Sequence, residues 1–106
     1  MAGPGAKPAP DTQPRLRLDK WLWQARFFKS RVLSADVIES GHCRVNGQRT
    51  RKPGHGICIG DVLTFAQGKQ IRLIKVRALG LRRGPAEEAQ ALYLDLDPQA
   101  APEALE

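Results

Sequence analysis

Two short helical patterns, followed at once by a tight hairpin signal, occupy residues 18–47. A first helix is predicted from about Leu18 to Phe27, because apolar residues recur along one face at helical spacing. Asp19 falls in its first turn, where a carboxylate suits the positive end of the helix dipole. The residues of the apolar face are Leu18, Trp21, Leu22, Ala25 and Phe28.

A second helix is predicted from about Arg31 to Ser40, and both of its ends carry signals. Ser30 is a favourable N-cap, since its hydroxyl can accept a hydrogen bond from the first turn. Gly41 stands where a residue in the left-handed region commonly ends a helix. The small Ser34 would let this helix approach the first one closely. The sequence therefore predicts two packed helices with a short basic joint between them.

The dipeptide Asn46-Gly47 is a strong signal for a hairpin with a two-residue type I′ turn. It joins strands predicted at Cys43–Val45 and Gln48–Arg51. Further strands are predicted at Val62–Phe65 and Ile71–Arg77, and the second breaks its alternation at Leu73-Ile74, which indicates a bulge or a change of covered face. The fold class is therefore α+β, with a small twisted antiparallel sheet beside the helices.

The C-terminal part is predicted to add a short helix near residues 85–93, because Pro85 fits a first helical position and acidic residues follow it. A strand over Leu92–Leu96 is the competing interpretation. Residues 1–14 are rich in Pro, Gly and Ala and are predicted to be a disordered tail. Residues 95–106 are predicted to be an acidic frayed tail, which leaves one domain at 15–94.

Positive charge is concentrated in the first four fifths of the chain. Residues 1–83 contain all 17 Lys and Arg and five acids, a net charge of +12, whereas residues 84–106 contain six acids and no base. Such a charge indicates a polyanionic partner. Structured RNA is favoured over DNA, because no long recognition helix suits a DNA major groove.

The basic residues fall on the first helix, at the joint and on the hairpin. Lys29 and Arg31 flank the N-terminus of the second helix, where free backbone N–H groups and the helix dipole favour a phosphate. Asn46 at the hairpin tip can hydrogen-bond a sugar or a base. The predicted RNA-binding residues are Arg17, Lys20, Arg26, Lys29, Ser30, Arg31, Arg44, Asn46, Arg49, Arg51 and Lys52.

Other functional classes find less support in the sequence. The spacing of His42-Cys43 and His55-x-x-Cys58 suits zinc poorly, and the cysteines are better interpreted as small buried residues. No paired carboxylates, Ser-His-Asp set or P-loop indicates an enzyme or a cofactor site. No membrane span or signal peptide is expected, and two cysteines suit a reducing cytosol, so we expect a cytoplasmic, monomeric protein without cofactors.

Residues 17–65 resemble the S-four (S4) RNA-binding domain in several places at once. The matching segments are RLDKWLWQARFFKSR, Val37-Ile38 with Gly41, Val45-Asn46-Gly47, Lys52-Pro53 and Gly60-Asp61. The resemblance implies the unit of two helices and a hairpin called the αL motif, which binds structured RNA. It carries RNA-binding positions over to Lys29, Ser30, Arg31, Arg44, Asn46, Arg49 and Lys52.

Residues 15–94 are similar to the ribosome-associated heat-shock protein fifteen family, through RLDKWLW, Arg83-Gly84-Pro85-Ala86 and Leu92-Tyr93. That resemblance implies binding to ribosomal RNA on the large ribosomal subunit, in the rescue or recycling of subunits that still carry a nascent chain on tRNA under heat stress. It implies no catalytic centre. Members of that family often extend into a basic C-terminal segment, whereas this sequence ends in an acidic one.

Two alternatives to ribosome binding remain open from the sequence. The chain could be an RNA-targeting module related to those of pseudouridine synthases, although only about 40 residues follow Phe65. It could also be a protein-interaction adaptor that uses Trp23 and Phe27. These two aromatic residues lie off the main helical face and form either a second packing face or an exposed platform.

Overall fold

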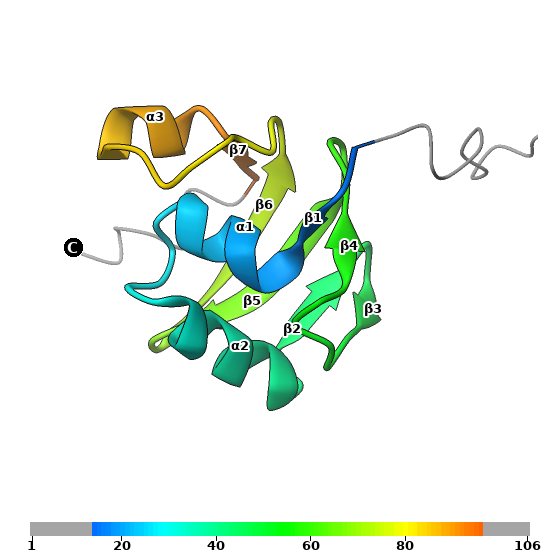
Figure 1. Ribbon diagram of the computed structural model, residues 1–106. Coiled ribbons are helices and arrows are strands. Elements are labelled where there is room, and N and C mark those ends of the chain that lie inside the picture. Colours follow the sequence, from blue (N-terminus) through cyan, green and yellow to red (C-terminus); the bar gives the residue numbers. More distant parts are fainter. Residues whose placement is uncertain (1–13, 97–106) are drawn as a thin grey trace, which may run out of the picture.

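The computed structural model describes residues 14–96, so the predicted disorder of residues 1–13 and fraying of residues 97–106 lie outside the described part. Three short helices and seven strands follow one another within residues 14–96 (Figure 1). They are β1 (Leu16–Arg17), α1 (Leu18–Gln24), α2 (Arg31–Glu39), β2 (Cys43–Val45), β3 (Gln48–Arg49), β4 (Gly56–Ile57), β5 (Val62–Gln67), β6 (Gln70–Val76), α3 (Ala86–Gln90) and β7 (Tyr93–Asp95).

The strands form a five-stranded antiparallel sheet in the order β3-β2-β5-β6-β7 and a separate two-stranded pair, β1-β4. Helices α1 and α2 pack against each other on one side of the larger sheet (Figure 1). The predicted α+β class is confirmed, whereas the β1-β4 pair was not predicted. None of the helices in residues 14–96 has the length and apolar character that crossing a membrane requires.

The core lies between the two helices and the sheet. Leu18, Trp21 and Leu22 of α1 are completely buried, and Ala25 just beyond it is 3% exposed, which confirms these four positions of the predicted apolar face. Phe28 lies beyond the helix and is half-buried. Burial of such side chains is the main favourable term in folding, at about 25 cal/mol per Å² of apolar surface. The other large core side chains are Phe27, Ile38, Ile57, Leu63, Phe65, Ile74 and Val76.

Helix α1 is shorter than predicted, because the chain turns sharply after Ala25. Arg26 has a φ of 68°, in the left-handed region, and the next residue leaves the helix axis. Phe27 then enters the core, with its ring centroid 4.9 Å from Phe65 and 4.6 Å from Tyr93. Trp23 is half-buried, and the guanidinium of Arg83 lies 5.6 Å from its ring centroid. The proposed exposed platform of Trp23 and Phe27 is therefore absent.

Helix α2 begins and ends as predicted. The Ser30 Oγ accepts a hydrogen bond of 3.1 Å from the Leu33 N–H, which is the expected N-cap. Gly41 has a φ of 87° just after the helix. Ser34 is completely buried, and its hydroxyl donates a 2.9 Å hydrogen bond to the Asp19 carbonyl. This small residue therefore brings α2 into close contact with α1.

The hairpin also has the predicted turn. Asn46 and Gly47 have φ values of 53° and 86°, and Val45 pairs with Gln48, as a two-residue type I′ turn requires. The returning strand β3 ends at Arg49, two residues earlier than predicted.

Strand β6 contains no bulge, since its residues pair one-to-one with β5 from Gln67↔Gln70 to Val62↔Lys75. The covered face does not change along β6 either, because Arg72, Ile74 and Val76 all lie on the side of the core. Ile74 is completely buried under the helices, whereas Leu73 lies on the opposite, more open face.

The C-terminal helix is shorter than the predicted 85–93, and a strand follows it within the range of the competing interpretation, Leu92–Leu96. Helix α3 ends at Gln90, and β7 pairs with β6. Leu92 between them is 9% exposed, and its carbonyl accepts hydrogen bonds from the N–H groups of Arg77 and Ala78. Residues 93–95 thus pair with the edge of β6 that β5 does not occupy, and they extend the sheet by one strand.

Candidate nucleic-acid interface

A buried carboxylate joins two arginines at the start of α1. Asp19 is 4% exposed, and it accepts two hydrogen bonds of 3.0 Å from Nε and NH2 of Arg17. Arg31 at the start of α2 places NH2 3.5 Å from the same carboxylate. Burial would raise the pKa of Asp19, but the hydrogen bonds and charge of Arg17, the charge of Arg31 and the Lys20 N–H together hold that pKa below its ordinary value.

The segment 51–56 lies beside this ion-pair group. Its backbone is tied to the start of α1, because the Leu18 N–H donates to the His55 carbonyl at 2.9 Å and the Asp19 N–H to the Pro53 carbonyl at 3.1 Å. Gly54 lies against the Arg17 guanidinium, whose Cζ would be 3.6 Å from a Cβ at that position. A surface cavity of about 540 Å³ is lined by Arg15, Arg51, Lys52, Pro53, Gly54, His55 and Gly56.

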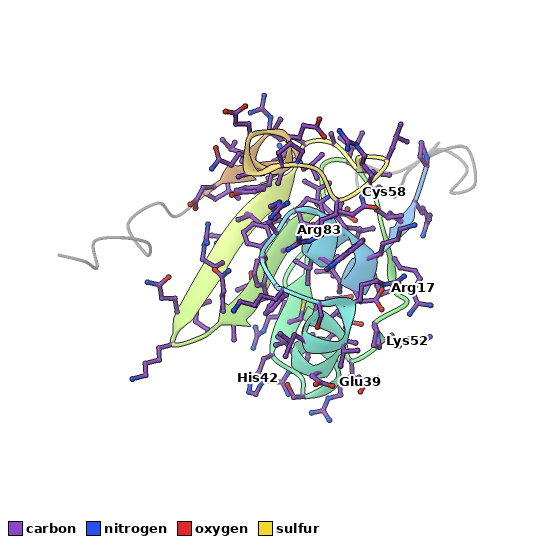
Figure 2. The ribbon with its side chains drawn as sticks, turned by 60° about the vertical axis from the view of Figure 1, so that its left-hand side comes forward. Arg17, Glu39, His42, Lys52, Cys58 and Arg83 are labelled. Atoms are coloured by element: carbon purple, nitrogen blue, oxygen red, sulfur yellow. The ribbon has the colours of Figure 1, made fainter. Side chains whose placement is uncertain are left out.

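These elements bring together five basic residues from three separate segments of the sequence. Arg17 and Lys52 lie on the same flank of the molecule (Figure 2). We call this group the helix-side basic surface, and it consists of Arg15, Arg17, Arg31, Arg51 and Lys52. The side chains of Arg17 and Arg31 remain 55% and 43% exposed, so their unused N–H groups can reach a ligand.

The joint between the helices supplies Lys29, which is exposed, and Ser30, which is half-buried. Lys20 lies in the first turn of α1 and is also half-buried. Ser30 is used as the α2 N-cap, so its first role is in the fold. Arg26 lies at the other end of α1 from Arg17, where its Nε donates to the Gly84 carbonyl at 2.6 Å.

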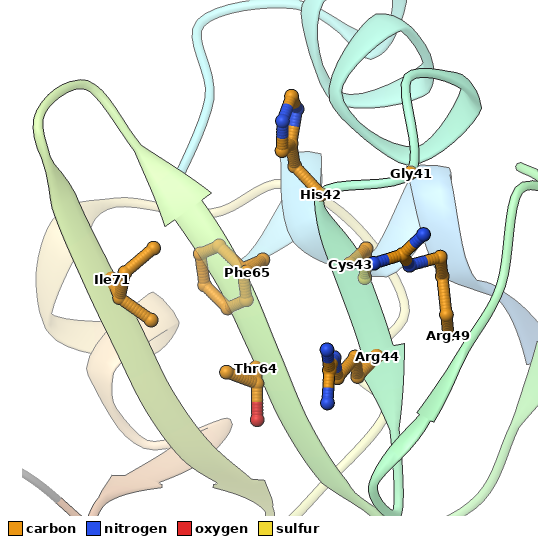
Figure 3. Close-up of a pocket in the computed structure, with 8 residues that line it drawn as sticks. All are labelled: Gly41, His42, Cys43, Arg44, Arg49, Thr64, Phe65 and Ile71. Atoms are coloured by element: carbon orange, nitrogen blue, oxygen red, sulfur yellow. The ribbon is translucent and has the colours of Figure 1, made fainter.

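Two predicted arginines lie on a different face. Arg44 and Arg49 are direct cross-strand partners in β2 and β3, and both are exposed on the side of the sheet away from the helices. They line a cavity of about 310 Å³ with Gly41, His42, Cys43, Thr64, Phe65 and Ile71, where Arg49 reaches across toward β2 (Figure 3). This pair therefore does not belong to the helix-side basic surface.

Arg51 connects the two faces around the β3 edge. Its NH2 would be 3.1 Å from a Cβ at Gly41, and Gly41 also lines the cavity beside Arg44 and Arg49. Arg51 thus links the helix-side basic surface to the face that carries Arg44 and Arg49.

Asn46 has a role inside the fold that the sequence did not indicate. Its Nδ2 donates to Asp61 Oδ1 at 3.1 Å, and its Oδ1 accepts from the Val62 N–H at 2.9 Å. Asp61 is 6% exposed and also accepts a 2.9 Å hydrogen bond from the Cys58 N–H. The Asn46 amide therefore fastens the hairpin to the following turn, and contact with RNA remains a prediction for it.

Sequence reasoning missed the role of Asp19 and the position of segment 53–56. The Arg-x-Asp spacing of Arg17 and Asp19 was an available signal, but the approach of Arg31 depends on helix packing.

Within residues 14–96, no three His, Cys, Asp or Glu side chains are grouped in a way that could hold a metal ion. Cys43 and Cys58 are free thiols that are 1% and 2% exposed, which confirms the prediction that they are small buried residues. Burial raises the pKa of the Cys43 thiol to about 12, so it is a neutral packing group.

Several known proteins are similar to this chain in sequence. The S4 domain model matches residues 16–63. Heat shock protein 15 of Escherichia coli is 46% identical over 78 residues, which are 74% of this chain and 58% of that protein. The RQC P-site tRNA stabilizing factor of Listeria innocua is 36% identical over 78 residues, which are 74% of this chain and 83% of that one.

A solved structure extends the likeness to three dimensions. The trimeric structure of Vibrio cholerae heat shock protein 15 matches with a TM-score of 0.73 and 41% identity, over 77% of this chain and 82% of that one. The present chain spans less than two thirds of the length of the Escherichia coli protein. It belongs to the S4 domain family and, within it, to the group that contains heat shock protein 15.

Proposed function

We propose that the chain is a non-enzymatic RNA-binding protein that contacts ribosomal RNA on the large ribosomal subunit. The observation that carries this proposal is the helix-side basic surface, where Asp19 fixes two arginines beside the cavity lined by segment 51–56. Most of this surface comes from the segment that matches the S4 domain.

The chemistry of the surface suits a phosphate backbone. Guanidinium groups bind phosphate oxygens through paired N–H donors, and a lysine adds a mobile charge. Arg31 and Lys29 stand at the N-terminus of α2, where the helix dipole also favours an anion. Contacts of this kind recognise the shape and backbone of folded RNA more than its sequence.

The names of the relatives support a more specific role. One group carries the name heat shock protein 15, and another is named as a factor that stabilises P-site tRNA. We propose on this basis that the chain acts in rescue or recycling of large subunits that carry a nascent chain on tRNA, in the cytoplasm and under heat stress. We expect a monomer in solution, and light scattering distinguishes it from a trimer like the Vibrio cholerae relative.

Co-sedimentation with purified large ribosomal subunits tests the proposal. The double variant Lys29→Ala plus Arg31→Ala is expected to lose most binding, because it removes two phosphate-binding charges at the start of α2. The matched control is Lys69→Ala plus Arg77→Ala, which removes the same charge from exposed positions just before and just after β6. Binding by the first variant that equals binding by the control would contradict the placement of the site.

A further inference from the structure

Asp19 is a carboxylate in the middle of a surface proposed to bind an anion, which needs an explanation. A negative charge there should weaken the attraction for RNA, yet it is almost completely buried and paired to two arginines. We propose that Asp19 is a positioning residue, which holds the guanidiniums of Arg17 and Arg31 together as one two-pronged site for an RNA phosphate. This inference rests on the proposed function.

The two arginines come from different elements and have no other partner in the described chain that would fix them together. Arg17 belongs to β1 and Arg31 to the first turn of α2, and both side chains are about half exposed. A long arginine side chain has many rotamers, and ordering it on binding reduces affinity. Their common carboxylate removes much of that disorder before the ligand arrives.

The pairing leaves donors available for a phosphate. Asp19 receives Nε and NH2 of Arg17 and only NH2 of Arg31, so each guanidinium keeps N–H groups that no residue of 14–96 accepts. Gly54 lies directly against the Arg17 guanidinium and carries no side chain that could cover it. A phosphodiester can therefore take hydrogen bonds from both arginines at once.

The backbone of Asp19 has a separate structural role. Its N–H donates to the Pro53 carbonyl, and its carbonyl accepts from the Ser34 hydroxyl. Both hydrogen bonds use main-chain atoms, so they remain possible when the carboxylate is replaced by an amide. The substitution Asp19→Asn therefore changes the arginine partner while it keeps the size of the side chain and these tethers.

The test uses the opposite signs of two effects. Asp19→Asn adds one unit of positive charge, so charge attraction alone predicts tighter binding to RNA. Positioning predicts weaker binding, by roughly tenfold, since two arginines must then be ordered by the ligand. The matched control is Asp36→Asn on the exposed side of α2, which makes the same charge change without an arginine partner in the described residues.

The dissociation constant for purified large ribosomal subunits is measured at one fixed salt concentration for each variant. We expect Asp36→Asn to bind as tightly as wild type or slightly tighter, and Asp19→Asn to bind about tenfold more weakly. In a background of Arg17→Ala plus Arg31→Ala, Asp19→Asn is expected to cause no further loss, because there is nothing left to position.

The outcomes separate the inference from the proposed function. Binding by Asp19→Asn that is as tight as wild type or tighter overturns the inference. The inference also fails if Asp19→Asn weakens binding by the same factor in the Arg17→Ala plus Arg31→Ala background, which would indicate a general effect on folding. If the Arg17→Ala plus Arg31→Ala protein binds like wild type, these arginines are not the site and the inference fails, whereas a wild-type protein that does not bind overturns the proposed function itself. Circular dichroism of every variant at the assay temperature shows that the compared proteins are folded.

Discussion

The ionisation of Asp19 makes a pH-dependent contribution to the stability of the fold. Its carboxylate is buried, so desolvation acts to raise its pKa, but Arg17 and Arg31 outweigh this and lower it. The ordinary value of 3.8 applies when the chain is unfolded. A group whose pKa is lower in the folded state stabilises that state above its unfolded pKa and loses the contribution as the pH falls.

Acid unfolding therefore carries a specific contribution from this residue. Between pH 5 and pH 3, the free energy of unfolding of wild type is expected to fall more than that of Asp19→Asn, whose side chain does not titrate. Urea unfolding at the two pH values measures the difference, and Asp36→Asn serves as the control. The same decrease in wild type and Asp19→Asn would show that the arginines do not depress this pKa.

Several individual residues of the fold could be predicted, because their signals are local. Ser30 caps a helix through a bond three residues away, and Asn46-Gly47 closes a turn between adjacent strands. The ion pair of Asp19 with Arg31 spans twelve residues and requires packed helices, so no local pattern contains it. Candidate charges and the local pair of Arg17 and Asp19 were thus predictable, and the approach of Arg31 was not.

The hairpin β2–β3 is linked to the rest of the sheet by the Asn46 amide. That side chain bonds Asp61 and the Val62 N–H, which come from the turn and strand that follow. Asn46→Ala is expected to lower the free energy of unfolding by about 1–3 kcal/mol, because buried or half-buried polar groups lose their partner.

Gln48→Ala is the matched control for this change, since Gln48 is exposed and also lies beside the turn. Denaturant unfolding of both variants compares them directly. If Asn46→Ala is as stable as Gln48→Ala, the amide does not fasten the hairpin in the way these hydrogen bonds indicate.

Among the elements, the central residues of α1, α2 and the hairpin could be predicted from local sequence patterns. The C-terminal ends of α1, β3 and α3 could not. Helix α1 stops early because Phe27 packs against Phe65 and Tyr93, which lie far along the chain. Strand β7 forms because β6 offers a free edge. Such ends depend on tertiary contacts that compete with local helix propensity.

The whole molecule has two unlike sides. Helices α1 and α2 cover one face of the sheet, and the helix-side basic surface lies beside their first turns, while Arg44 and Arg49 lie on the open face. The alternation of Cys43, Arg44 and Val45 predicts that Arg44 points away from the core, and the structure confirms it. The approach of Arg17, Arg31 and segment 51–56 to one another depends on tertiary packing, so the helix-side basic surface could not be predicted.

Crosslinking of the protein to RNA in living cells, followed by sequencing of the crosslinked sites, tests the central claim most directly. The account predicts crosslinks concentrated in ribosomal RNA of the large subunit, and a strong loss of these crosslinks in the Lys29→Ala plus Arg31→Ala variant but not in Lys69→Ala plus Arg77→Ala. Recovery of messenger or transfer RNA alone, without large-subunit ribosomal RNA, would contradict it.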